Sequence, residues 1–326
     1  MPLDATDVVV IGMGNVAVDV TRVLAKHVDE LAATDMADHA VDHLRTSRVE
    51  RITMVGRRGP AEAKFTTKEL RELGELPNAD IALNPDELVL GPASRRYADS
   101  DATTGKNLEV MRAFAEQPRE GKPRLVTLRF LLSPVALEGE SRVEAVRFER
   151  NRLVEREDGS LSAVGTGEYE TVPAQLVLRS VGYKGSALPG VPFDERGAVI
   201  PNQAGRVLTE KGGATVPGVY VAGWIKRGPS GVIGTNKADA METVASLLED
   251  AAAGLLHDPQ RGRPGPDVID ALLAERGCRP FSHEDWARLD RAELARGAEQ
   301  GRPRVKAVSV EQMFEWAEAD GHSERD

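Results

Sequence analysis

The segment with the clearest chemical potential is rich in glycine: Gly12-Met13-Gly14-Asn15-Val16-Ala17. It follows an apolar run at 8–11 and precedes apolar residues that recur every three or four positions, which predicts a strand, a turn and a helix. In such a unit the first glycine permits a tight turn, the second lets a pyrophosphate approach the backbone, and the small third residue lets the helix pack on the strand. The segment therefore favours dinucleotide binding, and a tight turn without a ligand is the alternative.

A second segment of chemical interest, Arg57-Arg58, follows the next expected strand at 51–55. An acidic residue at this position would hydrogen-bond the ribose of NAD, whereas two guanidinium groups match a 2′-phosphate in charge and in bidentate geometry. Solvated surface arginines are the alternative interpretation. Because the pair follows the second strand of a unit with a dinucleotide fingerprint, it favours NADP over NAD.

The elements that must position these segments begin with strands and helices in alternation. The apolar positions extend the first helix to Leu31, a short helix is expected within 34–48, and Thr66 and Gly74 bound a helix at 67–73. The later expected elements are, in chain order, a helix at 108–117, antiparallel strands at 125–132 and 143–149, buried strands at 174–181 and 219–222, a helix at 236–252, a linker at 257–266 and amphipathic helices beyond it.

Composition and charge limit the classes of protein to which the chain can belong. Its 326 residues are 41% hydrophobic and 29% charged, a soluble globular balance, and its apolar runs are too short to span a membrane. The 42 basic and 52 acidic residues give a net charge of −10, which disfavours nucleic acid as a partner. The single Cys278 and the lack of a signal sequence predict a cytoplasmic protein. The local basic pairs Arg57-Arg58 and Lys226-Arg227 point to a small anionic ligand.

Further motifs accompany the two segments. They are, in chain order, Asp19 and Arg22, Thr34-Asp35, Val55–Pro60, Phe65-Thr66, Lys68–Leu73, Arg179–Tyr183 and Gly223–Thr235. Together they make the first 250 or so residues resemble the adrenodoxin-reductase-type ferredoxin–NADP reductases, most closely the bacterial branch. The Gly223-Trp224 pair followed by Lys226-Arg227 is specific to this resemblance, because most flavoprotein relatives end that strand in Gly-Asp.

The resemblance implies sites for two cofactors, NADP and FAD. It assigns Met13, Gly14, Asn15 and Val16 to the NADP pyrophosphate, Arg57 and Arg58 to the 2′-phosphate, Glu69 to the adenosine side, and Trp224, Gly231, Val232 and Ile233 to the flavin, with Gly231 also near the nicotinamide. Backbone N–H groups at a helix start can bind the electron-rich pyrimidine edge of a flavin, which agrees with the last assignment.

The implied fold is α/β and has three parts. Residues 1–180 form a Rossmann-like NADP-binding domain with an inserted antiparallel β-meander, residues 181–252 are the C-terminal portion of a FAD-binding domain, and residues 253–326 are a linker and helical tail. The family also has an N-terminal fingerprint for the ADP half of FAD, which these residues lack. We therefore expect a fragment, a split gene product or a domain with a new role, which alone binds NADP and holds FAD weakly or not at all.

The implied function is that of a ferredoxin–NADP reductase, a flavoprotein oxidoreductase. NADPH gives a hydride to FAD, and single electrons pass to ferredoxin or another iron–sulfur protein. The cofactors carry this chemistry, so we expect no catalytic side chain and no metal site. One alternative is an NADP-binding module without independent redox activity. Another is a reductase component resembling the small subunit of glutamate synthase, against which the Gly223-Trp224 pair argues.

Overall fold

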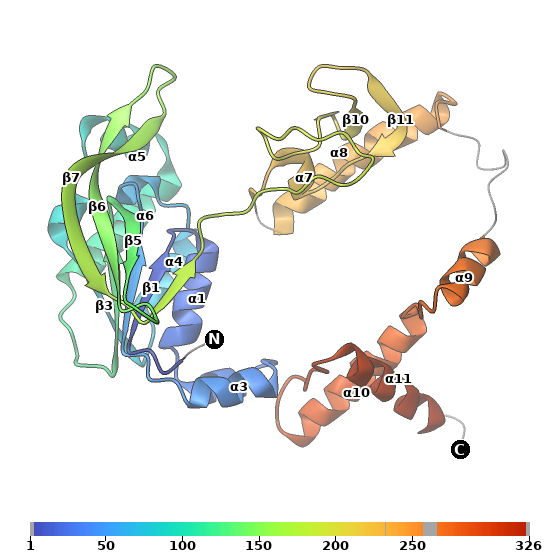
Figure 1. The fold of residues 1–326 in the computed structure, drawn as a ribbon, viewed down its shortest axis with the longest axis horizontal. Coiled ribbons are helices and arrows are strands. Elements are labelled where there is room, and N and C mark those ends of the chain that lie inside the picture. The colour runs from blue at the N-terminus through green and yellow to red at the C-terminus, as the bar shows by residue number, and fades with distance from the viewer. Residues whose placement is uncertain (1–2, 232, 257–265, 324–326) are drawn as a thin grey trace. The chain divides into compact units, whose positions relative to one another are not determined.

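A computed structural model describes residues 3–231, 233–256 and 266–323 (Figure 1). The chain divides into two compact units. Unit 1 comprises residues 1–181 with 281–326, and unit 2 comprises residues 182–280.

Unit 1 is built around a five-stranded parallel sheet in the order β3-β4-β2-β1-β8. Its strands are β1 (Asp7–Ile11), β2 (Arg51–Val55), β3 (Ala79–Leu83), β4 (Arg124–Arg129) and β8 (Leu176–Arg179). The strands predicted at 7–11, 51–55 and 174–181 are confirmed in place. The sequence patterns did not indicate β3.

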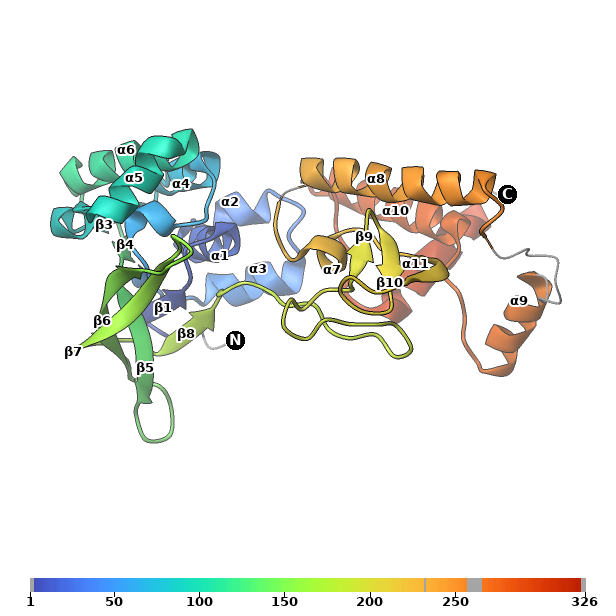
Figure 2. The same cartoon turned by 90° about the horizontal axis from the view of Figure 1, so that it is seen from above.

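Each face of this sheet is covered by a different layer, as Figure 2 shows for unit 1. The helices α1 (Asn15–Ala25), α4 (Thr67–Gly74) and α6 (Ala102–Glu116) cover one face, and an antiparallel meander of β5 (Leu132–Glu138), β6 (Ala145–Glu155) and β7 (Leu161–Pro173) covers the other. Val8 and Val10 of β1 pack with the helices, and Val9 packs with Phe148 of the meander. Burial on both faces explains why β1 is continuously apolar. The predicted α/β fold with an inserted meander is confirmed.

The antiparallel strand predicted at 125–132 is wrong, because two strands of different sheets share this stretch. β4 ends at Arg129 as an inner strand of the parallel sheet, and β5 begins at Leu132 in the meander. Leu131, which separates them, adopts a left-handed conformation with φ of 58°. A non-glycine residue rarely takes this conformation, so the apolar pattern gave no sign of the break.

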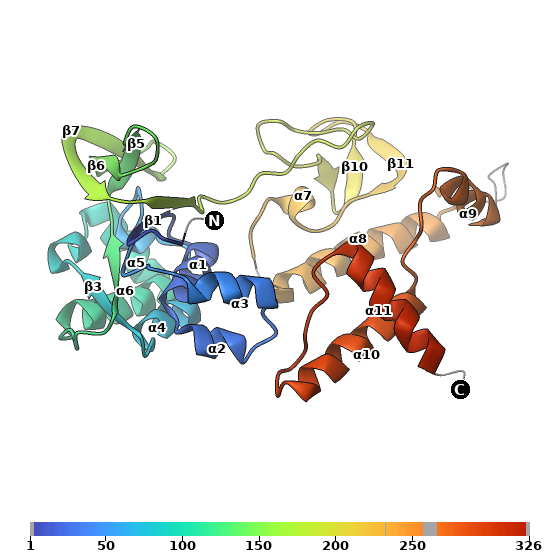
Figure 3. The same ribbon diagram turned by 60° about the horizontal axis from the view of Figure 1, so that its bottom comes forward.

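The other elements of unit 1 are α2 (Val28–Ala32), α3 (Asp38–Arg45), η1 (Pro60–Glu62), η2 (Pro85–Leu88), α5 (Pro92–Ser100), α10 (His283–Glu299) and α11 (Val310–Ser323). The first helix ends at Ala25 rather than Leu31, because His27 is extended and caps α2. Figure 3 shows α10 and α11. The segment that joins these two helices contacts the α2–α3 connection and the start of α3. Lys306 pairs with Asp35 at 2.8 Å, and Arg302 pairs with Asp38.

Unit 2 is smaller and has a short antiparallel sheet in the order β11-β10-β9. Its elements are β9 (Asn202–Gln203), β10 (Arg206–Leu208), β11 (Thr215–Tyr220), α7 (Trp224–Arg227), α8 (Ile233–Ala252) and α9 (Pro266–Glu275). The strand predicted at 219–222 as buried is only partly so: β11 ends at Tyr220, Val219 and Ala222 are exposed, and Val221 is buried. No helix in the part of the chain that the structure describes is long and apolar enough to cross a membrane.

Candidate functional site

The glycine segment forms the turn between β1 and α1, as predicted. Gly12 has φ of 146°, and a Cβ atom there would lie 2.1 Å from the carbonyl oxygen of Ser180. Its N–H donates to the carbonyl of Val55 at 2.9 Å, which joins the turn to the end of β2. Gly14 is the N-cap of α1, and a Cβ atom there would meet nothing within 4 Å. The first glycine is therefore required by the fold, whereas the second leaves open space beside the backbone.

The start of α1 fits an anionic group. Its N-cap, Gly14, offers no side chain to the first-turn N–H groups, and such groups at a helix start attract phosphate. The Asn15 side chain is engaged elsewhere, because its Oδ1 accepts the N–H of Thr66 at 2.8 Å. Met13 is tied by its carbonyl to the N–H of Lys64 at 2.7 Å. Two hydrogen bonds from the segment that leads into α4 therefore hold the turn at residues 13–16 in place.

Thr66 was expected to cap α4, and it does occupy the N-cap position. Its side chain makes no capping hydrogen bond, however, and its backbone N–H points to Asn15 instead. The starts of α1 and α4 are therefore linked by a side chain of the glycine segment. Sequence reasoning missed this contact because 51 residues separate its two partners.

Arg57 and Arg58 follow β2 directly and lie beside the glycine turn. The residue before them, Gly56, is so close to Met13 that a Cβ atom at Gly56 would lie 2.7 Å from the Cγ of Met13. Arg57 is exposed and Arg58 is half-buried. No carboxylate among residues 3–231, 233–256 and 266–323 forms an ion pair with either guanidinium. Two cations without an anionic partner beside a helix start fit a phosphorylated ligand.

Glu69 lies in the first turn of α4 and is half-buried. Its Oε2 atom is inaccessible to solvent and has no hydrogen-bond partner within the described part of the chain. A buried polar atom without a partner costs free energy, and a rotation of the half-buried Glu69 side chain would bring the atom to a donor. This observation fits the assignment of Glu69 to the nucleotide, which came from the resemblance.

A second candidate region lies in unit 2, around the turn α7. Gly223, with φ of 80°, precedes Trp224, whose side chain is 46% exposed. The Trp224 ring lies against that of Tyr183, with a centroid distance of 5.6 Å and an interplanar angle of 31°. Tyr183 is exposed as well. An exposed pair of aromatic rings offers apolar surface to a planar ligand.

Residues assigned to the flavin surround the start of α8. Gly231 has φ of 86°, and a Cβ atom there would lie 2.8 Å from the side chain of Thr235, so only glycine fits. Val232 lies outside the described residues, and α8 begins at Ile233. Arg227 of α7 donates to the carbonyl of Ser230 and to the side chain of Asn236, which holds α7 next to this helix start.

A buried ionic cluster fixes α7 to α8, and sequence reasoning missed it. The Nζ of Lys226 lies 3.1 Å from Oδ1 of Asp239, 2.7 Å from Oε2 of Glu242 and 3.1 Å from the hydroxyl of Thr243. Asp239 also accepts the N–H of Gly223 at 2.5 Å. The expectation that Lys226-Arg227 binds a small anion is therefore wrong, because Lys226 and Arg227 are neutralised by side chains of α8. The spacing of Asp239, Glu242 and Thr243 on one helix face was the available signal.

Contacts within the cluster shift the pKa values of Lys226 and Asp239 in the directions that keep both side chains charged. Burial by itself would lower the pKa of Lys226, but the hydrogen bonds and charges of Glu242 and Asp239 outweigh burial and raise that pKa. Burial would likewise raise the pKa of Asp239, but the N–H of Gly223 and the charge of Lys226 lower it.

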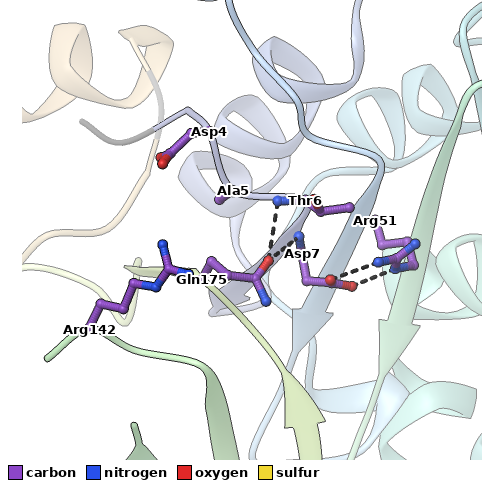
Figure 4. A pocket seen from close by; sticks show the side chains of 7 residues that line it. All are labelled: Asp4, Ala5, Thr6, Asp7, Arg51, Arg142 and Gln175. Carbon is purple, nitrogen blue, oxygen red and sulfur yellow. Dashed lines mark hydrogen bonds and ion pairs between the residues drawn. The ribbon is translucent and has the colours of Figure 1, made fainter. Parts of the chain in front are cut away.

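A hollow of about 440 Å³ lies at the end of the parallel sheet where β1 and β2 begin, away from the glycine turn (Figure 4). It is lined by the first residues of β1 and β2, where Asp7 pairs with Arg51 at 2.5 Å and the Oε1 of Gln175 accepts the N–H groups of Thr6 and Asp7. These groups satisfy one another. Ligands of open parallel sheets bind at the carboxyl ends of the strands. The candidate nucleotide site is therefore at the end of the sheet where Gly12 follows β1.

Comparisons with known proteins point to one family. No family model matches the chain. The NADPH-ferredoxin reductase FprA of Mycobacterium leprae is 42% identical over 314 residues, which are 96% of this chain and 67% of that protein. The mitochondrial NADPH:adrenodoxin oxidoreductase of Homo sapiens is 41% identical over 96% of this chain and 64% of that protein. Among solved structures, Mycobacterium tuberculosis FprA in complex with NADPH matches with a TM-score of 0.84 and 41% identity over 97% of this chain and 68% of that one.

Proposed function

This chain belongs to the adrenodoxin-reductase-type family of NADPH–ferredoxin reductases, and we propose that it is an oxidoreductase component that binds NADPH and serves electron transfer to an iron–sulfur protein. The observation that carries the proposal is the arginine pair Arg57-Arg58, which lacks anionic partners in the described structure and lies beside the Gly12–Val16 turn. The acceptor is a ferredoxin or a related protein, as in the relatives' names.

Residues 1–180 serve as the NADP-binding domain in this proposal. Gly14 and the start of α1 hold the pyrophosphate through backbone N–H groups, which Met13 and Asn15 brace from the α4 side. Arg57 and Arg58 bind the 2′-phosphate by charge-assisted hydrogen bonds. Glu69 accepts a hydrogen bond from the adenosine half through its carboxylate, which is half-buried in the first turn of α4.

Residues 181–252 contribute one wall of a FAD site, and residues 253–326 supply the tail, of which the linker expected at 257–266 lies outside the described residues except for its last residue. Trp224 offers an aromatic face, Gly231 gives the backbone the positive φ that precedes α8, and the start of α8 from Ile233 presents N–H groups. When bound, FAD accepts a hydride and releases electrons singly, which links NADPH to a one-electron acceptor. Because the cofactors carry this chemistry, the proposal assigns no side chain as a catalytic acid or base.

A cytoplasmic location completes the proposal. It rests on the sequence, whose single cysteine is typical of a reducing compartment. Cys278 is free and exposed.

The proposal is tested by reduction of a ferredoxin with NADPH and with NADH as donors. The chain spans about two thirds of the length of its mycobacterial relative. The assay is therefore run with the chain and FAD, and again with the remaining segment of that relative added as a separate polypeptide. We expect NADPH-dependent reduction and flavin absorption bands that survive gel filtration in the complemented sample, and little of either without the added segment. NADP binding without reduction in both samples would favour a binding module, and failure to bind NADP would overturn the proposal.

A further inference from the structure

The loop that carries Arg57 and Arg58 is held by the meander rather than by the parallel sheet alone. Three consecutive carbonyl groups of this loop accept hydrogen bonds from residues of the meander or of the turn that leads into it. The carbonyl of Gly56 accepts the N–H of Leu132 at 3.0 Å, and that of Arg58 accepts the N–H of Leu131 at 3.1 Å. The carbonyl of Arg57, between them, accepts the Nδ2–H of Asn151 at 2.8 Å.

Asn151 is the only side chain among these three donors. It lies in β6 and is buried, with 5% of its surface exposed. Its Nδ2 also donates to the hydroxyl of Ser133 at 2.8 Å, and its own N–H donates to the carbonyl of Leu131 at 2.7 Å. The side-chain amide is thus held by two hydrogen bonds and its backbone by a third, which leaves one orientation for the hydrogen that the amide gives to Arg57.

The meander is irregular at this point. The pairing of β6 with β7 shifts register between Glu149 and Asn151, next to Gly167 with φ of 80°. Such irregularities re-aim side chains and are frequent beside binding sites. Here the strand directs a buried amide away from the meander and onto the backbone of a loop at the edge of another sheet.

We infer that Asn151 is a positioning residue for recognition of the 2′-phosphate of NADP, an inference that rests on the proposed function. The bond to the Arg57 carbonyl fixes the peptide plane between Arg57 and Arg58, and so the points from which both side chains leave the backbone. Neither guanidinium is held by a carboxylate of the described structure, so this anchor, together with the bonds to the carbonyls of Gly56 and Arg58, is what places the two side chains before the ligand arrives. A preordered pair loses less freedom on binding a phosphate.

The test uses two probes that differ only in the 2′-phosphate, adenosine 2′,5′-bisphosphate and AMP. Their dissociation constants are measured by calorimetry on the full chain and on Asn151→Leu, which keeps the size of the side chain and removes its donors. We expect binding of the bisphosphate to weaken about five- to tenfold and binding of AMP to change less than about twofold. Ser133→Ala, which frees the Asn151 amide on one side, should cause a smaller loss of the same kind.

Asp80→Asn is the matched control. Asp80 is a buried polar side chain of the same unit, and it accepts the N–H groups of Glu120, Gly121 and Lys122 near the start of β3. It should lower stability without changing the ratio of the two dissociation constants. A merely structural role for Asn151 would give the same result as this control, and that outcome overturns the inference.

Failure of the inference is distinguishable from failure of the proposed function. If an Arg57→Ala/Arg58→Ala variant loses the preference for the bisphosphate while Asn151→Leu and Ser133→Ala keep it, only the role of Asn151 is overturned. If the double arginine variant also keeps the preference, the proposed NADP site itself is wrong, and the inference is overturned with it. Should Asn151→Leu not fold, Ser133→Ala decides, and an unchanged ratio there overturns the inference.

Discussion

The Arg57-Arg58 loop and the Lys226-Arg227 turn look alike in sequence, but the structure uses their charges differently. Each is a basic pair that follows a strand and a glycine-bearing turn. Arg57 and Arg58 meet no carboxylate in the described structure, whereas Lys226 and Arg227 are paired with Asp239 of α8. The role of a basic pair therefore depends on which acidic side chains the fold brings to it. One pair is available to a ligand, and the other holds two helices together.

The two units also differ in how much apolar surface their cores bury. In unit 1 the parallel sheet is buried on both faces, and residues such as Val10, Ile52 and Leu128 are inaccessible to solvent. In unit 2 the fully apolar core is a small cluster of Ile200, Val207 and Val221. Where little apolar area is buried, ion pairs contribute more to holding helices and strands together. Removing one partner of a buried ion pair is strongly destabilising, because the other charge is left uncompensated.

The largest effect is expected from Lys226→Met. It removes the nearer of the two cations that pair with Asp239, whose side chain is 7% exposed, and leaves only Arg227 at 3.6 Å. We expect unit 2 to lose about 3 kcal/mol of stability because a buried charge is left largely uncompensated. Hydrogen exchange should show faster exchange in residues 182–256 and unchanged exchange in the parallel sheet of unit 1. Arg57→Ala, which removes the same charge from an unpaired site, is the control and should leave both units unchanged.

The same cluster sets the pH range over which unit 2 is stable. The pKa of Asp239 is below its usual 3.8, so its share of the stabilisation is complete above that pH and is lost as the pH falls through the lowered value. The pKa of Lys226 is above its usual 10.5, so its share is complete below that pH and is lost as the pH rises through the raised value. In Lys226→Met the alkaline loss of stability should be smaller, because Tyr220, whose pKa is also raised, still contributes to it, and an unchanged loss would contradict this account.

A pair of glycine variants should separate folding from binding in unit 1. In Gly12→Ala a Cβ atom would lie 2.1 Å from the Ser180 carbonyl oxygen, at φ of 146°, so we expect a loss of about 1–3 kcal/mol from strain, measured by thermal unfolding. In Gly14→Ala the added methyl meets nothing within 4 Å, so stability should hold while NADP binding weakens. Equal unfolding temperatures for the two variants would show that the turn is not constrained as described.

The smallest effect is expected at the start of α10. Ser282 and Asp285 form a capping box, and the N–H and hydroxyl of Ser282, with Arg288, lower the pKa of Asp285 to about 2. Ser282→Ala should cost about 0.5–2 kcal/mol. Because the lowered pKa means stabilisation above its usual 3.8, the native cap should weaken as the pH falls from about 4 to 2. Asp285→Asn should remove that dependence, which thermal melts across this range can check.

The sequence predicted the local features of the candidate site and missed the contacts made over long distances. The strand at 7–11, the glycine turn and the arginine pair after 51–55 follow from short-range patterns, since burial on both faces and tight turns restrict residue types directly. The hydrogen bond from the Asn151 amide to the Arg57 carbonyl could not be predicted, because its two partners are 94 residues apart in the chain. Leu131 was equally hidden, since a leucine gives no sign of a left-handed turn.

The most direct test of the central claim is a calorimetric titration of NADP⁺ and NAD⁺ into the chain and into its Arg57→Ala/Arg58→Ala variant. The account predicts that the variant binds NADP⁺ more weakly by roughly 2–4 kcal/mol, because charge-assisted hydrogen bonds to the 2′-phosphate are lost, while NAD⁺ binding hardly changes. Equal losses for both nucleotides, or none for either, would contradict the claim that these arginines read the 2′-phosphate.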